Sequence, residues 1–177
     1  MALWSGAFRF GSARAQGAAV GKTSLSDTLH VLTVESINVL ARTGPDGVVL
    51  VDGGPAAARE DLLQAVAALP GSGPIRTLFN THWHPEQTGL NEHVGTAGGT
   101  IIAQENTRLW LTTDITYPWD GKHFEPLPKI AQPNKPFYDE GELGSDVRYG
   151  YLRHAAHTDG DLYVQFRDAN EIGRAHV

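Results

Sequence analysis

The chain has 177 residues, of which 41% are hydrophobic and 19% are charged, and this length suits one domain with a sizeable core. The net charge of -6 and the isoelectric point near 5.7 argue against nucleic acid and anionic membranes as partners. No apolar run approaches the roughly 20 residues that span a bilayer, and because the chain has no cysteine, nitrogen and oxygen atoms must hold any metal.

Residues 1–27 have the composition of a leader that precedes the domain. They are rich in small residues, and Ala13-Arg14-Ala15 fits the pattern of a signal-peptide cleavage site. They lack a basic start, however, and Arg9 interrupts the apolar stretch. We therefore predict a disordered leader or the remainder of a clipped export signal, which leaves a periplasmic or secreted location and a cytoplasmic one both open.

Strand and helix signals alternate in the following segment. The predicted strands are 28–34, 37–43, 48–54, 75–81 and 99–104. The turn sequence Gly-Pro-Asp-Gly at 44–47 predicts that the second and third of these strands form a hairpin. Residues 55–69 predict a helix, because Pro55 suits a first turn and the apolar residues that follow share one face.

The remaining elements complete a single predicted domain over residues 28–170. A short helix is predicted at 105–113, and further strands at 147–155 and 161–166. Between them, residues 115–143 form an irregular segment that is rich in proline and aromatic residues. A loop of this length inside a compact domain is usually functional or disordered.

The last seven residues, 171–177, are unusual. Their sequence EIGRAHV can be reverse-translated as GAGATCGGAAGAGCACACGTC, which contains the start of a common sequencing adapter. Our hypothesis is that this segment is adapter read-through and that the natural protein continues beyond Asn170. A clean read of the parent gene that still encodes Gly-Arg-Ala-His-Val would contradict this hypothesis.

Two histidines follow the buried strand 75–81, at a position where α/β proteins tend to place ligand sites. In extended backbone, His82 and His84 point to the same side and can converge on one ion. Pro85 favours extended backbone at His84 and can open a helix. A third candidate ligand is His157, which follows another strand. Taken alone, a pair of histidines also fits a polar surface loop.

The ordered set "VDGG", strand, "THWHPEQTG" and "AAHTDGD" resembles the metallo-β-lactamase fold family of metallohydrolases. The resemblance covers roughly Leu29 to Phe166. It implies an α/β (α+β) fold, a four-layer αββα sandwich with metals at one edge, here with its C-terminal part missing. Matched by position, it also implies that His82, His84 and His157 hold a zinc ion, and that Asp52 supports the metal-binding loop.

The sequence departs from the family pattern T-H-x-H-x-D-H at two positions. Glu86 stands in place of the aspartate, and Gln87 in place of the last histidine. In ordinary members these two residues help to hold a second metal, so we expect one zinc ion per chain. Glu86 is expected to orient or deprotonate the metal-bound water, or else to be a helix N-terminal acid.

Other residues are expected to surround the metal. Gln87 is placed to hydrogen-bond the substrate or a bound water, and Thr158 belongs to a tight polar turn that fixes His157. Trp119, together with Trp110 and Tyr117, forms either an apolar wall for the substrate or ordinary core packing.

We therefore expect a zinc-dependent hydrolase, in which a metal-activated water attacks an ester-, lactone-, thioester- or lactam-like bond of a small molecule. One alternative is a mononuclear iron dioxygenase of the same fold, which metal identity would distinguish. The other is a non-catalytic metal-binding member of the fold. Glu86 and Gln87, which replace ligands of the second metal, are compatible with this alternative. The full-length parent is expected to be an enzyme, whereas this chain, if it is truncated, is expected to be inactive. The sequence does not indicate an oligomeric state.

Overall fold

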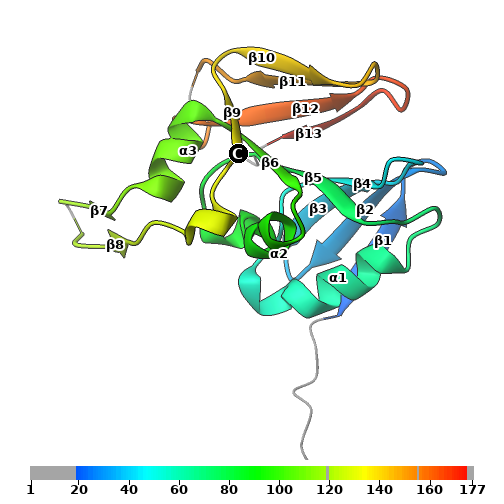
Figure 1. The fold of residues 1–177 in the computed structure, drawn as a ribbon, viewed down its shortest axis with the longest axis horizontal. Coiled ribbons are helices and arrows are strands. Elements are labelled where there is room, and N and C mark those ends of the chain that lie inside the picture. The colour runs from blue at the N-terminus through cyan, green and yellow to red at the C-terminus, as the bar shows by residue number, and fades with distance from the viewer. Residues whose placement is uncertain (1–18, 119, 155, 175–177) are drawn as a thin grey trace, which may run out of the picture.

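The computed structural model of the protein describes residues 19–118, 120–154 and 156–174 (Figure 1). Its strands form a seven-stranded sheet of order β1-β2-β3-β4-β5-β6-β9, a four-stranded sheet of order β10-β11-β12-β13 and a two-stranded ribbon, β7-β8. The strands of the first sheet are β1 (Val20–Ser24), β2 (Leu29–Val34), β3 (Ile37–Arg42), β4 (Val48–Val51), β5 (Ile75–Asn80), β6 (Thr100–Gln104) and β9 (Lys135–Phe137). The others are β7 (Ile115–Thr116), β8 (His123–Phe124), β10 (Glu140–Leu143), β11 (Val147–Tyr151), β12 (Leu162–Phe166) and β13 (Glu171–Arg174).

The helices are short. They are α1 (Arg59–Ala67), α2 (Asn91–Thr96) and α3 (Glu105–Thr112), with 3-10 turns η1 (Ala56–Ala58), η2 (Pro85–Gln87) and η3 (Lys129–Ala131). The predicted helix 55–69 is therefore observed as η1 followed by α1. Among the described residues, none of these helices has both the length and the apolar character needed to cross a membrane.

The strand pairing in the first sheet changes from antiparallel to parallel at β4. Strands β1 to β4 are antiparallel, and the predicted hairpin at residues 44–47 is confirmed by the antiparallel pairing of β3 with β4. From β4 onward, β5, β6 and β9 are parallel to their neighbours. The carboxyl ends of β4, β5 and β6 therefore lie at one edge of the sheet, which is the edge where the histidines follow β5.

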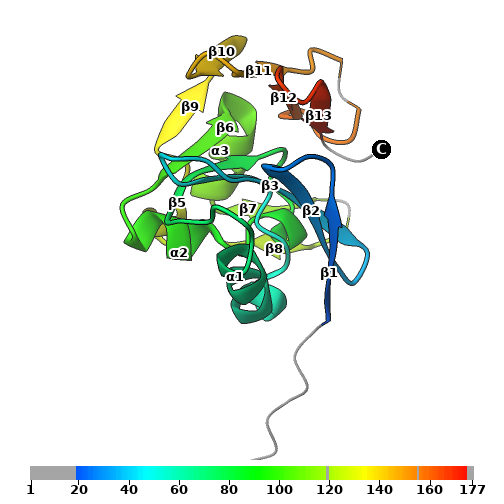
Figure 2. The same ribbon diagram turned by 90° about the vertical axis from the view of Figure 1, so that its right-hand side faces the viewer.

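The elements are arranged in layers. α1 and α2 lie on one face of the first sheet, and the second sheet lies on the other (Figure 2). Side chains alternate along the buried strand β5, so Leu78 packs in the helix-side core while Phe79 packs between the sheets. Within the described ranges no helix covers the outer face of the second sheet. The predicted mixed α/β architecture is confirmed, with three of the four expected layers described.

Two parts of the chain are more ordered than the sequence predicted. Val20–Ser24, inside the predicted disordered leader, form β1, which pairs with β2 from Val20↔Val34 to Ser24↔His30. The prediction of disorder is wrong for this strand, which was missed because its side chains are mostly exposed and lack apolar alternation. Residues 1–18 lie outside the described part of the chain.

The segment 115–143, predicted as irregular, contributes four short strands and one 3-10 turn. Its strand β9 completes the edge of the first sheet beside β6. Each strand is too short to show a periodic pattern, which explains why the sequence did not reveal them. At the other end, residues 171–174 form β13 beside β12, and residues 175–177, the rest of the segment predicted to be adapter read-through, lie outside the described residues.

Candidate metal centre

The first two histidines extend from the end of β5. Thr81 and His82 are buried, whereas His84 is half-buried. The backbone of His84 is extended (φ -62°, ψ 144°), and Pro85 follows it as the first residue of η2. This is the conformation expected for a residue that precedes proline. As a result, the rings of His82 and His84 face the same space, with centroids 4.8 Å apart.

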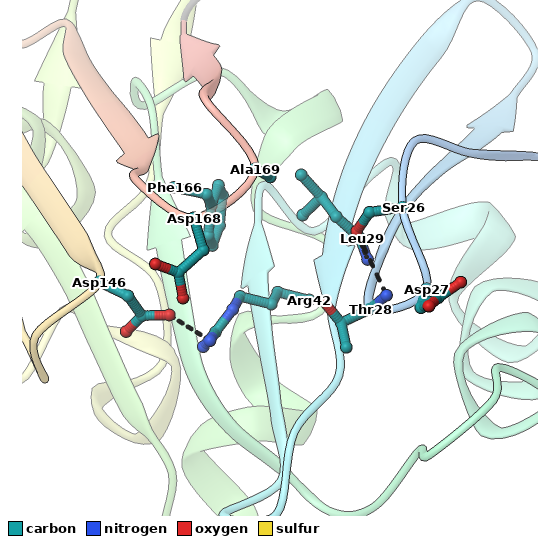
Figure 3. Close-up of a pocket in the computed structure, with 9 residues that line it drawn as sticks. All are labelled: Ser26, Asp27, Thr28, Leu29, Arg42, Asp146, Phe166, Asp168 and Ala169. Carbon is teal, nitrogen blue, oxygen red and sulfur yellow. Dashed lines mark hydrogen bonds and ion pairs between the residues drawn. The ribbon is translucent and has the colours of Figure 1, made fainter.

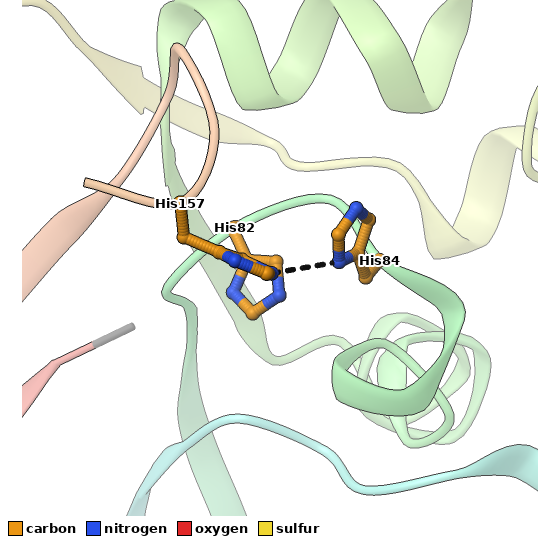
Figure 4. A group of neighbouring side chains, drawn as sticks. All are labelled: His82, His84 and His157. Atoms are coloured by element: carbon orange, nitrogen blue, oxygen red, sulfur yellow. Dashed lines mark hydrogen bonds between the residues drawn. The ribbon is translucent and has the colours of Figure 1, made fainter. Parts of the chain in front are cut away.

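The third histidine enters the same space from the loop between β11 and β12 (Figure 4). One ring nitrogen from each of His82, His84 and His157 lies within 4.8 Å of the other two. Nε2 of His157 is 3.0 Å from Nδ1 of His84, although 73 residues separate them in sequence. Two nitrogens bound to one tetrahedral ion at about 2.0–2.1 Å would be about 3.3 Å apart, so the spacing of His84 and His157 is close to that of two ligands of one ion.

The hydrogen bonds of His82 leave one nitrogen free for a metal. Nδ1 of His82 lies 3.0 Å from Oγ1 of Thr81, and this hydroxyl donates to Oδ2 of Asp52 at 2.8 Å. Because the hydroxyl hydrogen is directed to the carboxylate, Nδ1 of His82 must be the donor to Thr81. Nε2 then carries a lone pair, and it is buried with no hydrogen-bond partner. Such an atom is costly to bury unless it binds something, and a metal ion fits it.

The environment also keeps His82 neutral. Burial, together with the neighbouring His84 and His157, lowers the pKa of His82 to about 4. Burial likewise lowers the pKa of His84, against the opposing effect of Glu86. Histidine binds metals in its neutral form, so both rings are prepared to accept a metal near neutral pH.

Asp52 joins the end of β4 to the histidine loop. Its backbone is left-handed (φ 66°), and its carboxylate accepts hydrogen bonds from the backbone N–H and the hydroxyl of Thr81, each at 2.8 Å. Burial raises the pKa of Asp52 to about 7, although the two hydrogen bonds from Thr81 act in the opposite direction. Two backbone hydrogen bonds, Gly53 to Gln87 and Gly89 to Gly54, fasten the same loops together.

Replacing Asp52 by asparagine is expected to lower the free energy of unfolding by about 1–3 kcal/mol, because the new amide group would face one of the two donors of Thr81. Asparagine tolerates the left-handed backbone, so the variant tests the carboxylate alone. Urea unfolding in the presence of chelator measures the change. Asp46→Asn, at an exposed turn, is the control and should stay within about 0.5 kcal/mol of the wild type. Equal stability of the two variants would contradict the role of Asp52.

The loop that carries His157 is built around a buried carboxylate. Asp161 accepts hydrogen bonds from the backbone N–H groups of Ala156, His157 and Thr158 at 2.6–3.2 Å, and from the hydroxyl of Thr158 at 2.6 Å. Burial raises the pKa of Asp161, but these hydrogen bonds outweigh it and hold the pKa below its ordinary value. Thr158 therefore lies in the same turn as His157, and both its hydroxyl and its backbone N–H donate to Asp161.

The other predicted site residues occupy different positions around the cluster. Oε1 of Glu86 is 3.6 Å from Nδ1 of His84, and its side chain is 44% exposed. Gln87 is buried, and its Oε1 has no partner among the described residues. Trp119 lies outside the described residues. Sequence reasoning missed Thr81 and did not single out Asp161, although each lies within three residues of a predicted site residue.

Four aromatic rings form a cluster that contacts His84 through Trp83. Trp83 lies 4.4 Å from the ring of His84, between centroids, and stacks on Trp110 at 4.7 Å. Tyr117 and Phe124 pack edge-on against Trp83. Trp110 and Tyr117, which the sequence suggested as a wall for the substrate, therefore pack on Trp83 rather than directly on the histidines, and both are half-buried.

A separate cavity of about 210 Å³ lies between the two sheets near Arg42 (Figure 3). Arg42 ends β3 and pairs in register with Val49 at the start of β4, so the cavity lies at the sheet edge opposite to the histidines. Within the cavity, Arg42 forms an ion pair with Asp146. Its cation is thus already paired, and the chemistry points to the histidine cluster instead.

The fold and this cluster together define a class: a two-sheet α/β sandwich with a three-histidine candidate metal centre at one edge. The family model of the metallo-beta-lactamase superfamily matches residues 32–171. The chain therefore belongs to the metallo-beta-lactamase superfamily, and the resemblance found in the sequence is confirmed. Among curated proteins, none matches the chain.

Solved structures show the same fold. Metallo-beta-lactamase MIM-1 from Novosphingobium pentaromativorans is 20% identical with a TM-score of 0.65, over 86% of this chain and 59% of its own. The Cronobacter sakazakii metallo-beta-lactamase with a HARLDQ motif is 19% identical with a TM-score of 0.66, over 85% and 60%. SMB-1, solved with mercaptoacetic acid, is 18% identical with a TM-score of 0.68, over 91% and 64%. The chain thus spans about 59–64% of the length of these three structures.

Proposed function

We propose that the protein is a zinc-dependent hydrolase in which His82, His84 and His157 hold one ion. The superfamily and the histidine cluster indicate a metal-dependent hydrolase; zinc, the single ion and the class of bond are the proposal. The observation that carries it is the buried, unpartnered Nε2 of His82, which faces ring nitrogens of the other two histidines. Three nitrogen ligands with room for a water are typical of catalytic zinc.

When bound, the ion would act as a Lewis acid and supply an acidified water at neutral pH. Glu86 is placed to receive a proton from a water beside His84, since its carboxylate is near that ring yet open to solvent. The buried Oε1 of Gln87, which has no hydrogen-bond partner among the described residues, is a second acceptor in the segment that follows His84. Trp83 packs against His84 and keeps water from that side of the ring.

The substrate class is a small molecule with an ester-, lactone-, thioester- or lactam-like bond. All four bonds place a carbonyl carbon next to a leaving heteroatom, and the same proton transfer at Glu86 serves each of them. The similar solved structures are described as beta-lactamases, which supports including the lactam in the test panel. Because SMB-1 was solved in a complex with mercaptoacetic acid, small thiol acids are expected to bind this protein as well.

Replacing Glu86 by glutamine is expected to lower kcat about 10²–10⁴-fold on whichever substrate of the panel is hydrolysed, because the general base is lost. Zinc content, measured by elemental analysis, should stay near one ion per chain. Glu92→Gln is the matched control, since Glu92 lies on the next helix and pairs with Arg59. Unchanged kcat in Glu86→Gln would contradict the role of Glu86. Bound iron with oxygen consumption would instead support the dioxygenase alternative.

A further inference from the structure

Side chains of helix α3 form hydrogen bonds with the loop that carries His157. Nδ2 of Asn106 donates to the carbonyl of Asp159 at 2.7 Å, and the hydroxyl of Thr107 donates to the carbonyl of Gly160 at 2.9 Å. The approach at Gly160 is close enough that a Cβ there would come within 2.4 Å of Oγ1 of Thr107. The loop is therefore docked onto the first turns of this helix.

Trp110, in the next turn of α3, contacts both segments that supply the histidines. Its Nε1 donates to Oδ1 of Asp159 at 2.9 Å, two residues after His157. Its second contact is apolar: the ring of Trp110 stacks on Trp83 with 4.7 Å between centroids and 13° between planes. Trp83 is buried and stands between His82 and His84 in the sequence.

The two segments are joined at two levels. At their bases, the backbone N–H of Leu162 donates to the carbonyl of Thr81 at 3.0 Å. At their tips, where His84 and His157 lie 3.0 Å apart, Trp110 supplies a link through its stack and its N–H. We propose that Trp110 is a positioning residue that fixes the spacing between His157 and the His82–His84 pair. This inference rests on the proposed metal centre.

The test compares zinc affinity, measured by competition with a chromophoric chelator, in two variants that remove the hydrogen bond between Trp110 and Asp159 from either end and keep the stack on Trp83. Trp110→Phe keeps an aromatic ring for the stack and removes the N–H donor. Asp159→Ala removes the acceptor and leaves the stack intact. Each is expected to bind zinc about tenfold more weakly than the wild type, at the lower end of the range for residues that orient metal ligands. The double variant should be no weaker than either single variant, because both remove one hydrogen bond.

Two further measurements separate positioning from general stability. The melting temperature in excess chelator should be unchanged in Asp159→Ala, while the absorption bands of the cobalt-loaded protein shift. Arg108→Ala is the matched control on the same helix, because Arg108 pairs with Glu105 rather than with the loop. It should bind zinc as the wild type does.

Wild-type zinc affinity in both Trp110→Phe and Asp159→Ala would overturn the positioning role while leaving the metal centre intact. A wild-type protein that binds no zinc would overturn the proposed function itself, which is a distinguishable result. If Trp110→Phe does not fold, Asp159→Ala decides alone, since it leaves the aromatic stack in place.

Discussion

In His157→Ala the melting temperature is expected to become insensitive to chelator, whereas in the wild type chelator should lower it by roughly 6–16 °C. The reason is linkage: a ligand at 100–1,000 times its dissociation constant stabilises the folded state by about 3–4 kcal/mol. For a domain of this size, each kcal/mol corresponds to roughly 2–4 °C. Removing one of three converging nitrogens removes the chelate that gives the ion its affinity.

Matched melting curves with and without chelator measure this effect. Because His157 is exposed, its loss should change the stability of the metal-free protein by no more than about 0.5 kcal/mol. His154→Ala is the control: it lies exposed in the same loop, outside the cluster, and should keep the full response to chelator. A wild-type melting curve that chelator does not move would count against the metal centre.

Replacing Asp161 by alanine is expected to lower the free energy of unfolding by about 3–5 kcal/mol. The carboxylate is fully buried and accepts from three backbone N–H groups and one hydroxyl, and these donors would lose their acceptor. Each unsatisfied donor costs roughly 1–3 kcal/mol, less where it can turn to water. Zinc affinity should fall as well, because the loop that presents His157 loses its internal support. Equilibrium unfolding in urea is the measurement.

The same residue predicts a pH dependence. The folded-state pKa of Asp161 lies below its unfolded value, so its contribution is fully present above about pH 4 and is lost as the pH falls through the folded pKa. Asp161→Asn should therefore lose less stability than the wild type between pH 5 and pH 2. Asp168→Ala, at an exposed turn, is the control for both measurements and should behave as the wild type. Parallel acid unfolding of Asp161→Asn and the wild type would contradict this account.

The sequence was informative where a pattern repeats or a backbone constraint acts locally. The buried strand β5 and the hairpin of β3 and β4 were predicted from apolar runs and turn residues, and Pro85 correctly indicated extended backbone at His84. The three histidines were recognised as a set because the order of motifs resembles the family. Their convergence within 4.8 Å depends on two segments 73 residues apart, which only the folded chain brings together.

What could not be predicted depends on long-range contacts. β1 is a strand because its backbone pairs with β2. The sequence Val20–Ser24 has no apolar alternation that would predict a strand. Thr81 looked like part of a motif, but its importance lies in the chain of hydrogen bonds from Asp52 to His82. The docking of Trp110 against Asp159 likewise joins residues 49 positions apart and leaves no local signature.

The two buried aspartates, Asp52 and Asp161, hold the histidine segments through hydrogen bonds that involve protein atoms alone. Folding of the chain therefore sets the positions of the histidine ligands, and binding of the ion is not needed to assemble them. It follows that the centre should be reversibly exchangeable: below the melting temperature the protein can be emptied, remain folded and be reloaded with a different divalent ion. Loading should then follow simple bimolecular kinetics, without a slow refolding phase, which distinguishes this centre from small domains that collapse when their zinc is removed.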